Sequence, residues 1–133
     1  MVLGCGIDIE EHKRFLKFFK STKPAHFFLS IFTQDEIKNY SIFSTPLCYA
    51  VSFSCKEAFY KAFSSAFNNV QIDLREVELI FHDEPGKGRA VVKFNGTALE
   101  LSLKNNLKIP PDFNYSISDS LVIFETVLIC DKN

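Results

Sequence analysis

The stretch from Pro46 to about Phe67 limits the possible folds most strongly, because no glycine or further proline interrupts it. Thr45-Pro46 is a typical helix start, with proline at the first helical position. At 1.5 Å per residue, the predicted helix is ~33 Å long, which makes it the longest element of the chain. We therefore expect one central helix around which the other segments pack.

This helix carries a charged pair near its middle. At about 100° per residue, Glu57 and Lys61 lie one turn apart on one face, while Phe59 lies nearly opposite and can pack. A carboxylate and an ammonium stacked this way suit a metal-bound polyphosphate, because the acid can hold the cation and the lysine the phosphate oxygens. The alternative is a solvated i,i+4 ion pair worth ~0.3–0.5 kcal/mol.

Residues 2–9 alternate in character and predict a half-buried strand. One face is apolar and consists of Leu3, Cys5, Ile7 and Ile9. The other face has two glycines without side chains followed by a carboxylate, namely Gly4, Gly6 and Asp8. Glycines at this spacing allow either a ligand or another backbone to come close. Asp8 is thus a second candidate metal ligand or simply the end of the strand.

From Glu10 to Phe19 the pattern becomes helical. Residues 13–23 contain five cations without an intervening acid, namely Lys13, Arg14, Lys17, Lys20 and Lys23. Such a patch can steer an acidic partner or an anionic cofactor, although each cation is equally well explained as part of a solvated face.

The remaining segments predict an α+β fold with a small antiparallel sheet packed against the long helix plus shorter helices. Thr33 and Glu36 form a capping box that starts a helix. Strands are expected at 77–82 and 89–94 around a turn, and at 113–118 and 121–130, the last of them central. Residues 97–107 fit a capped helix or a hairpin strand, and we favour the helix.

Composition narrows the class of protein. The 133 residues are 47% hydrophobic, include 15 phenylalanines and carry a formal net charge of −1, so the sequence predicts one globular domain over residues 1–133 and argues against nucleic-acid binding. The four cysteines show no metal-binding or disulfide spacing, which suits a cytoplasmic protein. No signal peptide or membrane-spanning run is recognisable, so we expect no membrane partner.

Two segments together resemble a known family. Gly6-Ile7-Asp8-Ile9-Glu10-Glu11, followed by Phe53-Ser54-Cys55-Lys56-Glu57-Ala58-Phe59-Tyr60-Lys61, is similar to the two signature motifs of the 4′-phosphopantetheinyl transferases, most closely the small holo-[acyl-carrier-protein] synthase type. Phe32 to Ile37 resembles the family's F-T-x-x-E-L element, and Ser116-Ile117-Ser118 its S-[IL]-S-H strand end.

The resemblance implies transfer of the phosphopantetheine arm of coenzyme A to a serine of an acyl carrier protein, with Mg²⁺ as cofactor and 3′,5′-ADP as the released product, as in fatty acid biosynthesis and lipid metabolism. It also implies a homotrimer with sites between subunits. In phosphoryl transfer of this kind, catalysis is mostly positioning and charge neutralisation.

The same resemblance suggests roles for individual residues. Asp8 and Glu57 would hold the metal, and Glu57, Lys61 and Glu36 are the catalytic candidates, the serine's base being Glu57, Glu36 through a water, or a metal-bound water. Coenzyme A would contact Lys56, Lys61, Ser116 and Ser118, although Lys56 fits a structural ion pair equally well. Lys13, Arg14 and Lys17 would meet the acidic helix of the carrier protein.

The sequence departs from the family pattern at three places. Ser52 stands where arginine is frequent, Ser64-Ser65-Ala66 continue where glycines usually turn the chain, and Asp119 replaces the histidine of the S-x-S-H strand end. These departures motivate an alternative, a non-catalytic relative that binds carrier protein or nucleotide. A second alternative is a purely structural α+β domain.

Overall fold

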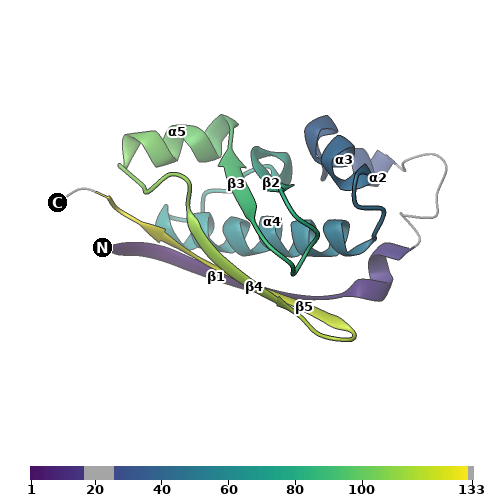
Figure 1. Cartoon of the computed structure of the whole chain (residues 1–133). Coiled ribbons are helices and arrows are strands. Elements are labelled where there is room, and N and C mark those ends of the chain that lie inside the picture. Colours follow the sequence, from purple (N-terminus) through teal and green to yellow (C-terminus); the bar gives the residue numbers. More distant parts are fainter. Residues whose placement is uncertain (17–25, 132–133) are drawn as a thin grey trace.

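The computed structural model describes residues 1–16 and 26–131 (Figure 1). In chain order its elements are β1 (Val2–Glu11), the 3-10 helix η1 (His12–Phe15), α2 (His26–Leu29), α3 (Gln34–Ser41), α4 (Leu47–Ala66), the 3-10 helix η2 (Leu74–Glu76), β2 (Val77–Phe81), β3 (Ala90–Phe94), α5 (Gly96–Lys104), β4 (Asp112–Ile117) and β5 (Leu121–Ile129).

The strands form two antiparallel sheets, whereas the sequence analysis expected one. The larger sheet has the order β1-β5-β4, and β2 pairs with β3 in a separate hairpin. Figure 1 shows α4 running along the larger sheet, with the hairpin, α3 and α5 on the other side of the helix. The α+β class, the long helix and the central position of the last strand are thereby confirmed.

Helix α4 is more deeply enclosed than its charged pair suggests. Every residue from Cys48 to Lys56 is buried, because the helix contacts β1 and β5 on one side and β2 on the other. A helix covered on all sides belongs to the core rather than to the surface. Apart from Leu47 at its start, the residues of the helix that are not fully buried lie in its second half and include Glu57, Tyr60 and Lys61.

The glycines of β1 are explained by the close approach of this helix. A Cβ atom added to Gly4 would lie 2.5 Å from the carbonyl oxygen of Ala62, and one added to Gly6 would overlap the carbonyl oxygen of Ala58. Of the two interpretations in the sequence analysis, close backbone packing is therefore the correct one for both glycines. This packing turns the apolar face of β1 outward, where Ile7 is 55% and Ile9 57% exposed.

The prediction of a helix from residue 10 onward is wrong for Glu10 and Glu11. Strand β1 continues to Glu11, because Glu10 pairs with Val122 and Glu11 with Leu121 at the start of β5. Strand pairing outweighs the local helical pattern here. The chain then forms only the short helix η1 before the described residues are interrupted at 17.

The N-terminal cap of α3 was predicted from the sequence, whereas that of α5 was not. The capping box at the start of α3 is confirmed, since the Glu36 amide donates to Thr33 Oγ1 (3.2 Å) and the Thr33 amide to Glu36 Oε1 (3.1 Å). Residues 97–104 are helical, as favoured above. The cap of α5 comes from Glu76, whose carboxylate accepts hydrogen bonds from the amides of Thr97 and Ala98.

Candidate functional site

Asp8 and the second half of α4 meet where β1 crosses the helix. The Lys61 ammonium donates to Asp8 Oδ1 (3.2 Å) and to the carbonyl oxygen of Ile7 (2.8 Å). Asp8 lies on the glycine face of β1, so its side chain points toward α4 and is only 9% exposed. Its other oxygen, Oδ2, is buried and has no hydrogen-bond partner among the described residues.

Glu57 shares the electrostatic environment of Asp8. The pKa of the Glu57 carboxyl is raised, first by burial and then by the negative charge of Asp8, while Lys61 and Arg14 act in the opposite direction. A second acid near a half-buried carboxylate makes ionisation of both unfavourable unless a cation neutralises them. The charge of Asp8 therefore acts on Glu57, the acid predicted to share a cation with it.

Sequence reasoning missed Glu10, the third carboxylate of this region. Because β1 extends to Glu11, Glu10 continues the face that holds Gly4, Gly6 and Asp8. Burial, and next the charge of Asp8, raise the pKa of its carboxyl. The period-two pattern of this face contained the signal, but the expected helix from residue 10 concealed it.

These side chains fit a divalent cation. In the described part of the chain, Arg14 and Lys61 are the cations that act on Glu10 and Glu57, and Asp8 Oδ2 is buried there without a hydrogen-bond partner, a costly state for an ionised group. In the part of the chain that the structure describes, no group of three or more acids, histidines or cysteines lies close enough to hold a metal by itself. Mg²⁺ uses one or two carboxylates and takes its other ligands from water and phosphate, so Asp8 and Glu57 are the residues that could hold it.

Two of the predicted partner-binding cations lie beside this region. Arg14 Nη1 contacts Glu10 Oε2 at 3.1 Å, and the guanidinium carbon lies 5.6 Å from the centre of the Phe53 ring. Lys13 is exposed in the same short helix. Lys17, the third predicted contact, falls outside the described residues.

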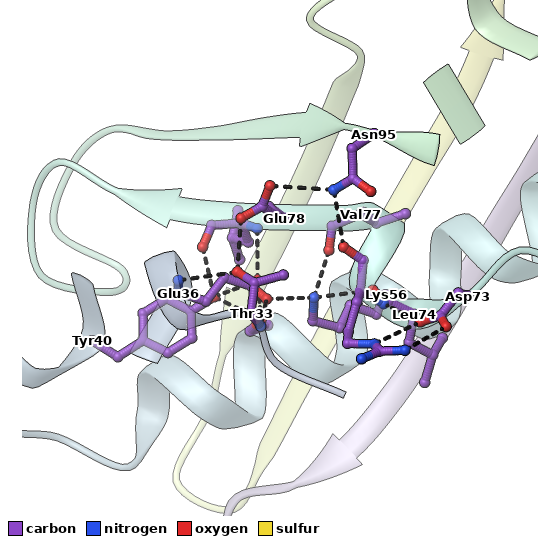
Figure 2. Close-up of polar contacts among 12 residues, drawn as sticks. Thr33, Glu36, Tyr40, Lys56, Asp73, Leu74, Val77, Glu78 and Asn95 are labelled. Carbon is purple, nitrogen blue, oxygen red and sulfur yellow. Dashed lines mark hydrogen bonds and ion pairs between the residues drawn. The ribbon is translucent and has the colours of Figure 1, made fainter. Parts of the chain in front are cut away.

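Lys56 and Glu36 lie elsewhere, in the core, as Figure 2 shows. Both are fully buried, and the Lys56 ammonium donates to Glu36 Oε1 (2.7 Å) and to the carbonyl oxygens of Leu74 (3.1 Å) and Val77 (2.5 Å). All three donors of the lysine are thus used. The structural ion pair that the sequence analysis left open for Lys56 is observed, and the geometry corrects its expected contact with coenzyme A.

The expected role of Glu36 as a base needs the same correction. Its carboxylate accepts from the Thr33 and Leu79 amides, from Lys56 and from the Ser52 hydroxyl (3.1 Å), so it has neither a free acceptor nor access to solvent. The Tyr40 hydroxyl, which has one proton, lies within hydrogen-bond distance of three acceptors in this network: Glu36 Oε2 (2.9 Å), Ser52 Oγ (2.7 Å) and the Leu79 carbonyl oxygen (2.6 Å). Position 52 faces the core in this chain, so its departure from arginine removes no contact from the site.

Ser116 and Ser118 do not converge with Asp8 within one chain. Ser116 pairs with Ile123, which pairs with Ile9, and this row of side chains points away from α4. Asp8, Phe124 and Tyr115 form the neighbouring row on the opposite face. Ser118 and Asp119 are exposed in the turn after β4. Ser116 therefore belongs to the outer side of the sheet, and Ser118 to the exposed turn at its end.

The missing glycines after α4 are replaced by asparagines. The helix runs to Ala66, and the chain then turns through Asn68 (φ 54°) and Asn69 (φ 63°). Asparagine is among the few residues that tolerate this left-handed conformation. The amide of Asn69 donates to the carbonyl oxygen of Ser64 (2.9 Å), so the turn is closed without glycine.

Comparison with known proteins identifies the relatives of this chain. A family model described as the 4′-phosphopantetheinyl transferase superfamily matches residues 4–118, a range that includes both sequence motifs. No curated protein is similar enough in sequence to be matched to the chain.

Solved structures share the fold over nearly the whole chain. Holo-[acyl-carrier-protein] synthase from Neisseria meningitidis superposes with a TM-score of 0.74 at 20% identity, covering 97% of this chain and 99% of that one. The ACPS–CoA complex of Chronobacterium ammoniagenes superposes with a TM-score of 0.72 at 19% identity, covering 96% of this chain and 97% of that one. Acyl carrier protein synthase of Mycobacterium tuberculosis superposes with a TM-score of 0.68 at 21% identity, covering 98% of this chain and 99% of that one.

Proposed function

The chain belongs to the 4′-phosphopantetheinyl transferase superfamily, and from this premise we propose that it transfers the 4′-phosphopantetheine arm of coenzyme A to a serine of an acyl carrier protein. One of the similar structures is a complex with coenzyme A, and others are holo-[acyl-carrier-protein] synthases, which supports both substrates.

We further propose that the chain acts as a single domain in the cytoplasm. The cysteines in the described part of the chain are free, which suits a reducing compartment. No helix among the described residues is long and apolar enough to cross a bilayer.

Asp8 Oδ2, which is buried and has no hydrogen-bond partner in residues 1–16 and 26–131, carries the proposal together with Glu57 and Lys61. Asp8 and Glu57 would hold Mg²⁺, and Lys61 would keep one donor for a phosphate oxygen while its other two bind Asp8 and Ile7. When bound, the metal would polarise the diphosphate and neutralise charge that develops during transfer. Lys61 is 51% exposed along its side chain and can therefore reach a bound nucleotide.

In the proposed reaction, the serine oxygen of the carrier forms a bond to the phosphorus that bears the pantetheine arm. The bond from that phosphorus to the bridging oxygen breaks, and 3′,5′-ADP leaves with the bonding electrons. Lys61 would hold the phosphate oxygens during this exchange, and positioning of this kind supplies most of the catalysis. The serine proton passes to Glu57 or to water, since Glu36 is enclosed in the core.

We also propose that the chain forms a homotrimer with sites between subunits. The outer face of the larger sheet exposes Ile7, Ile9 and Ile123, of which Ile123 is 40% exposed. Contiguous apolar side chains on a sheet face are typical of an interface between proteins. Ser116 lies on this same face, so a neighbouring subunit would supply the serines that are absent from the Asp8 side of the sheet. A monomeric mass in sedimentation equilibrium would contradict the trimer.

The direct test is incubation of the purified protein with coenzyme A, Mg²⁺ and an apo acyl carrier protein. Mass spectrometry should show a gain on the order of 340 Da on the carrier, the mass of one transferred arm. Omission of Mg²⁺ with added chelator should abolish the gain. An unchanged mass for every apo carrier of the same cell would overturn the proposal in favour of a non-catalytic relative.

A further inference from the structure

Arg14 contacts both chain segments that form the proposed cation site. Its Nη1 atom lies 3.1 Å from Glu10 Oε2 on β1, and its guanidinium lies over the Phe53 ring of α4, one turn before Glu57. The Glu10 side chain is only 10% exposed, whereas that of Arg14 is 58% exposed. One end of this ion pair is therefore fixed in the site, while the other is accessible to a partner.

The charge of Arg14 reaches beyond its ion pair. Glu10 shares the face of β1 that holds Asp8, and Phe53 lies one turn before Glu57 on α4, so a positive charge placed between Glu10 and Phe53 lies beside both proposed ligands. Arg14 thus offsets part of the negative charge that would otherwise attract a divalent cation to Asp8 and Glu57. Since a unit charge at a partly buried site acts at an effective dielectric below that of water, its removal changes cation affinity measurably.

The chemistry of the Arg14 guanidinium indicates which kind of group would bind its exposed side. A guanidinium binds carboxylates in preference to neutral groups and has donors beyond the one used by Glu10. The carrier protein, which is the partner given by the proposed function, would supply such a carboxylate. A carrier carboxylate would compete with Glu10 for Arg14.

We propose that Arg14 couples carrier binding to cation binding: a carboxylate of the carrier draws Arg14 away from Glu10, and the cation at Asp8 and Glu57 is then held more tightly. Linkage makes the coupling reciprocal, so that the bound cation strengthens carrier binding by the same factor. As a consequence, the site binds its metal most tightly only after the carrier, with its acceptor serine, has bound. This inference rests on the proposed function but concerns Glu10 and Arg14, not the metal ligands.

The test measures Mn²⁺ affinity, by electron paramagnetic resonance or calorimetry, in the full-length protein without coenzyme A. Arg14→Ala should bind Mn²⁺ more tightly by roughly 5-fold, the lower end of typical coupling factors, although it binds the carrier more weakly. Apo carrier should tighten Mn²⁺ binding of the wild type by a similar factor and leave that of Arg14→Ala unchanged. In a Glu10→Gln background, the effect of Arg14→Ala should shrink.

Lys13→Ala is the matched control, because it removes the same charge from the neighbouring exposed position, where no ion pair with Glu10 is present among the described residues. It should change Mn²⁺ affinity less than Arg14→Ala does. Equal Mn²⁺ affinity in wild type and Arg14→Ala, or equal effects of both alanine variants, would overturn the coupling while leaving the proposed function intact. Absence of Mn²⁺ binding in the wild type, both alone and with 3′,5′-ADP added, would instead overturn the cation site itself, and the coupling with it.

Discussion

Two lysines of α4, Lys56 and Lys61, each form an ion pair with a carboxylate, and the two pairs differ in exposure and in hydrogen bonding. Lys56 and Glu36 lie 2.7 Å apart, and neither side chain has exposed area. Lys61 and Asp8 lie 3.2 Å apart, with side chains that are 51% and 10% exposed. The first pair has all its polar atoms paired, as Figure 2 shows for the lysine, whereas the second leaves Asp8 Oδ2 without a partner in the described part of the chain.

This difference in burial and hydrogen bonding indicates different roles for the two ion pairs of α4. A buried ion pair is tolerated only where further hydrogen bonds satisfy both groups, and the network around Glu36 does so by joining α3, α4 and β2. A buried acceptor left unpaired in a native structure is rare and calls for an explanation such as a missing ion. We therefore assign the first pair to stability and the second to the proposed transfer.

The largest expected effect follows from breaking the buried pair. Lys56→Met leaves the Glu36 charge enclosed without its partner, which costs ~3–5 kcal/mol of unfolding free energy. Urea denaturation followed by circular dichroism measures this loss. The double variant Lys56→Met with Glu36→Gln should recover part of it, because no uncompensated charge remains. A loss below about 1 kcal/mol in the single variant would contradict the structural role of the pair.

The same substitution in the exposed pair should act on the reaction. Lys61→Met should lower kcat/KM for transfer on the order of 10²-fold, because one charged contact to the phosphates is lost. Its unfolding free energy should fall by less than that of Lys56→Met, because the Lys61 end of the pair is exposed to water, whereas both partners of the Lys56–Glu36 pair are enclosed. Carrier modification is followed by mass spectrometry at varied coenzyme A concentration. A variant that transfers normally but unfolds easily would reverse our assignment of the two pairs.

A smaller effect concerns the pH dependence of stability. The carboxyl pKa values of Glu10 and Glu57 lie above the ordinary 4.5, so the folded chain holds these protons more tightly than the unfolded chain does. Their contribution to stability is fully present below pH 4.5 and is lost as the pH rises through the raised values. Denaturation at several pH values with chelator should show a steeper decline for wild type than for the Glu10→Gln/Glu57→Gln variant. Parallel curves would contradict the predicted shifts.

Much of the fold was predictable because local signals and tertiary packing agree. The uninterrupted run after Pro46 forms α4, and the Thr33–Glu36 capping box forms as expected. The division of the strands into two sheets was not predictable, since pairing partners are set by packing on α4. The continuation of β1 through Glu10 was also missed, because pairing with Val122 overrides a pattern that resembles a helix.

The candidate site was predictable only in part, for a related reason. Spacing placed Glu57 and Lys61 on one face, and the family motifs added Asp8, which the structure brings to Lys61. Spacing says nothing about burial, however, and so did not distinguish Lys56 from Lys61. The shared motif included Lys56 among the candidate contacts, whereas the fold encloses it. Glu36 was misplaced for the same reason.

The central claim is that Asp8 and Glu57 hold one divalent cation beside the diphosphate of coenzyme A. Titration of Mn²⁺ into the protein with coenzyme A, followed by electron paramagnetic resonance, tests it most directly. We predict one Mn²⁺ per chain in the wild type and in Lys56→Arg, and loss of that binding in both Asp8→Asn and Glu57→Gln. Unchanged Mn²⁺ binding in either acidic variant would contradict the shared site.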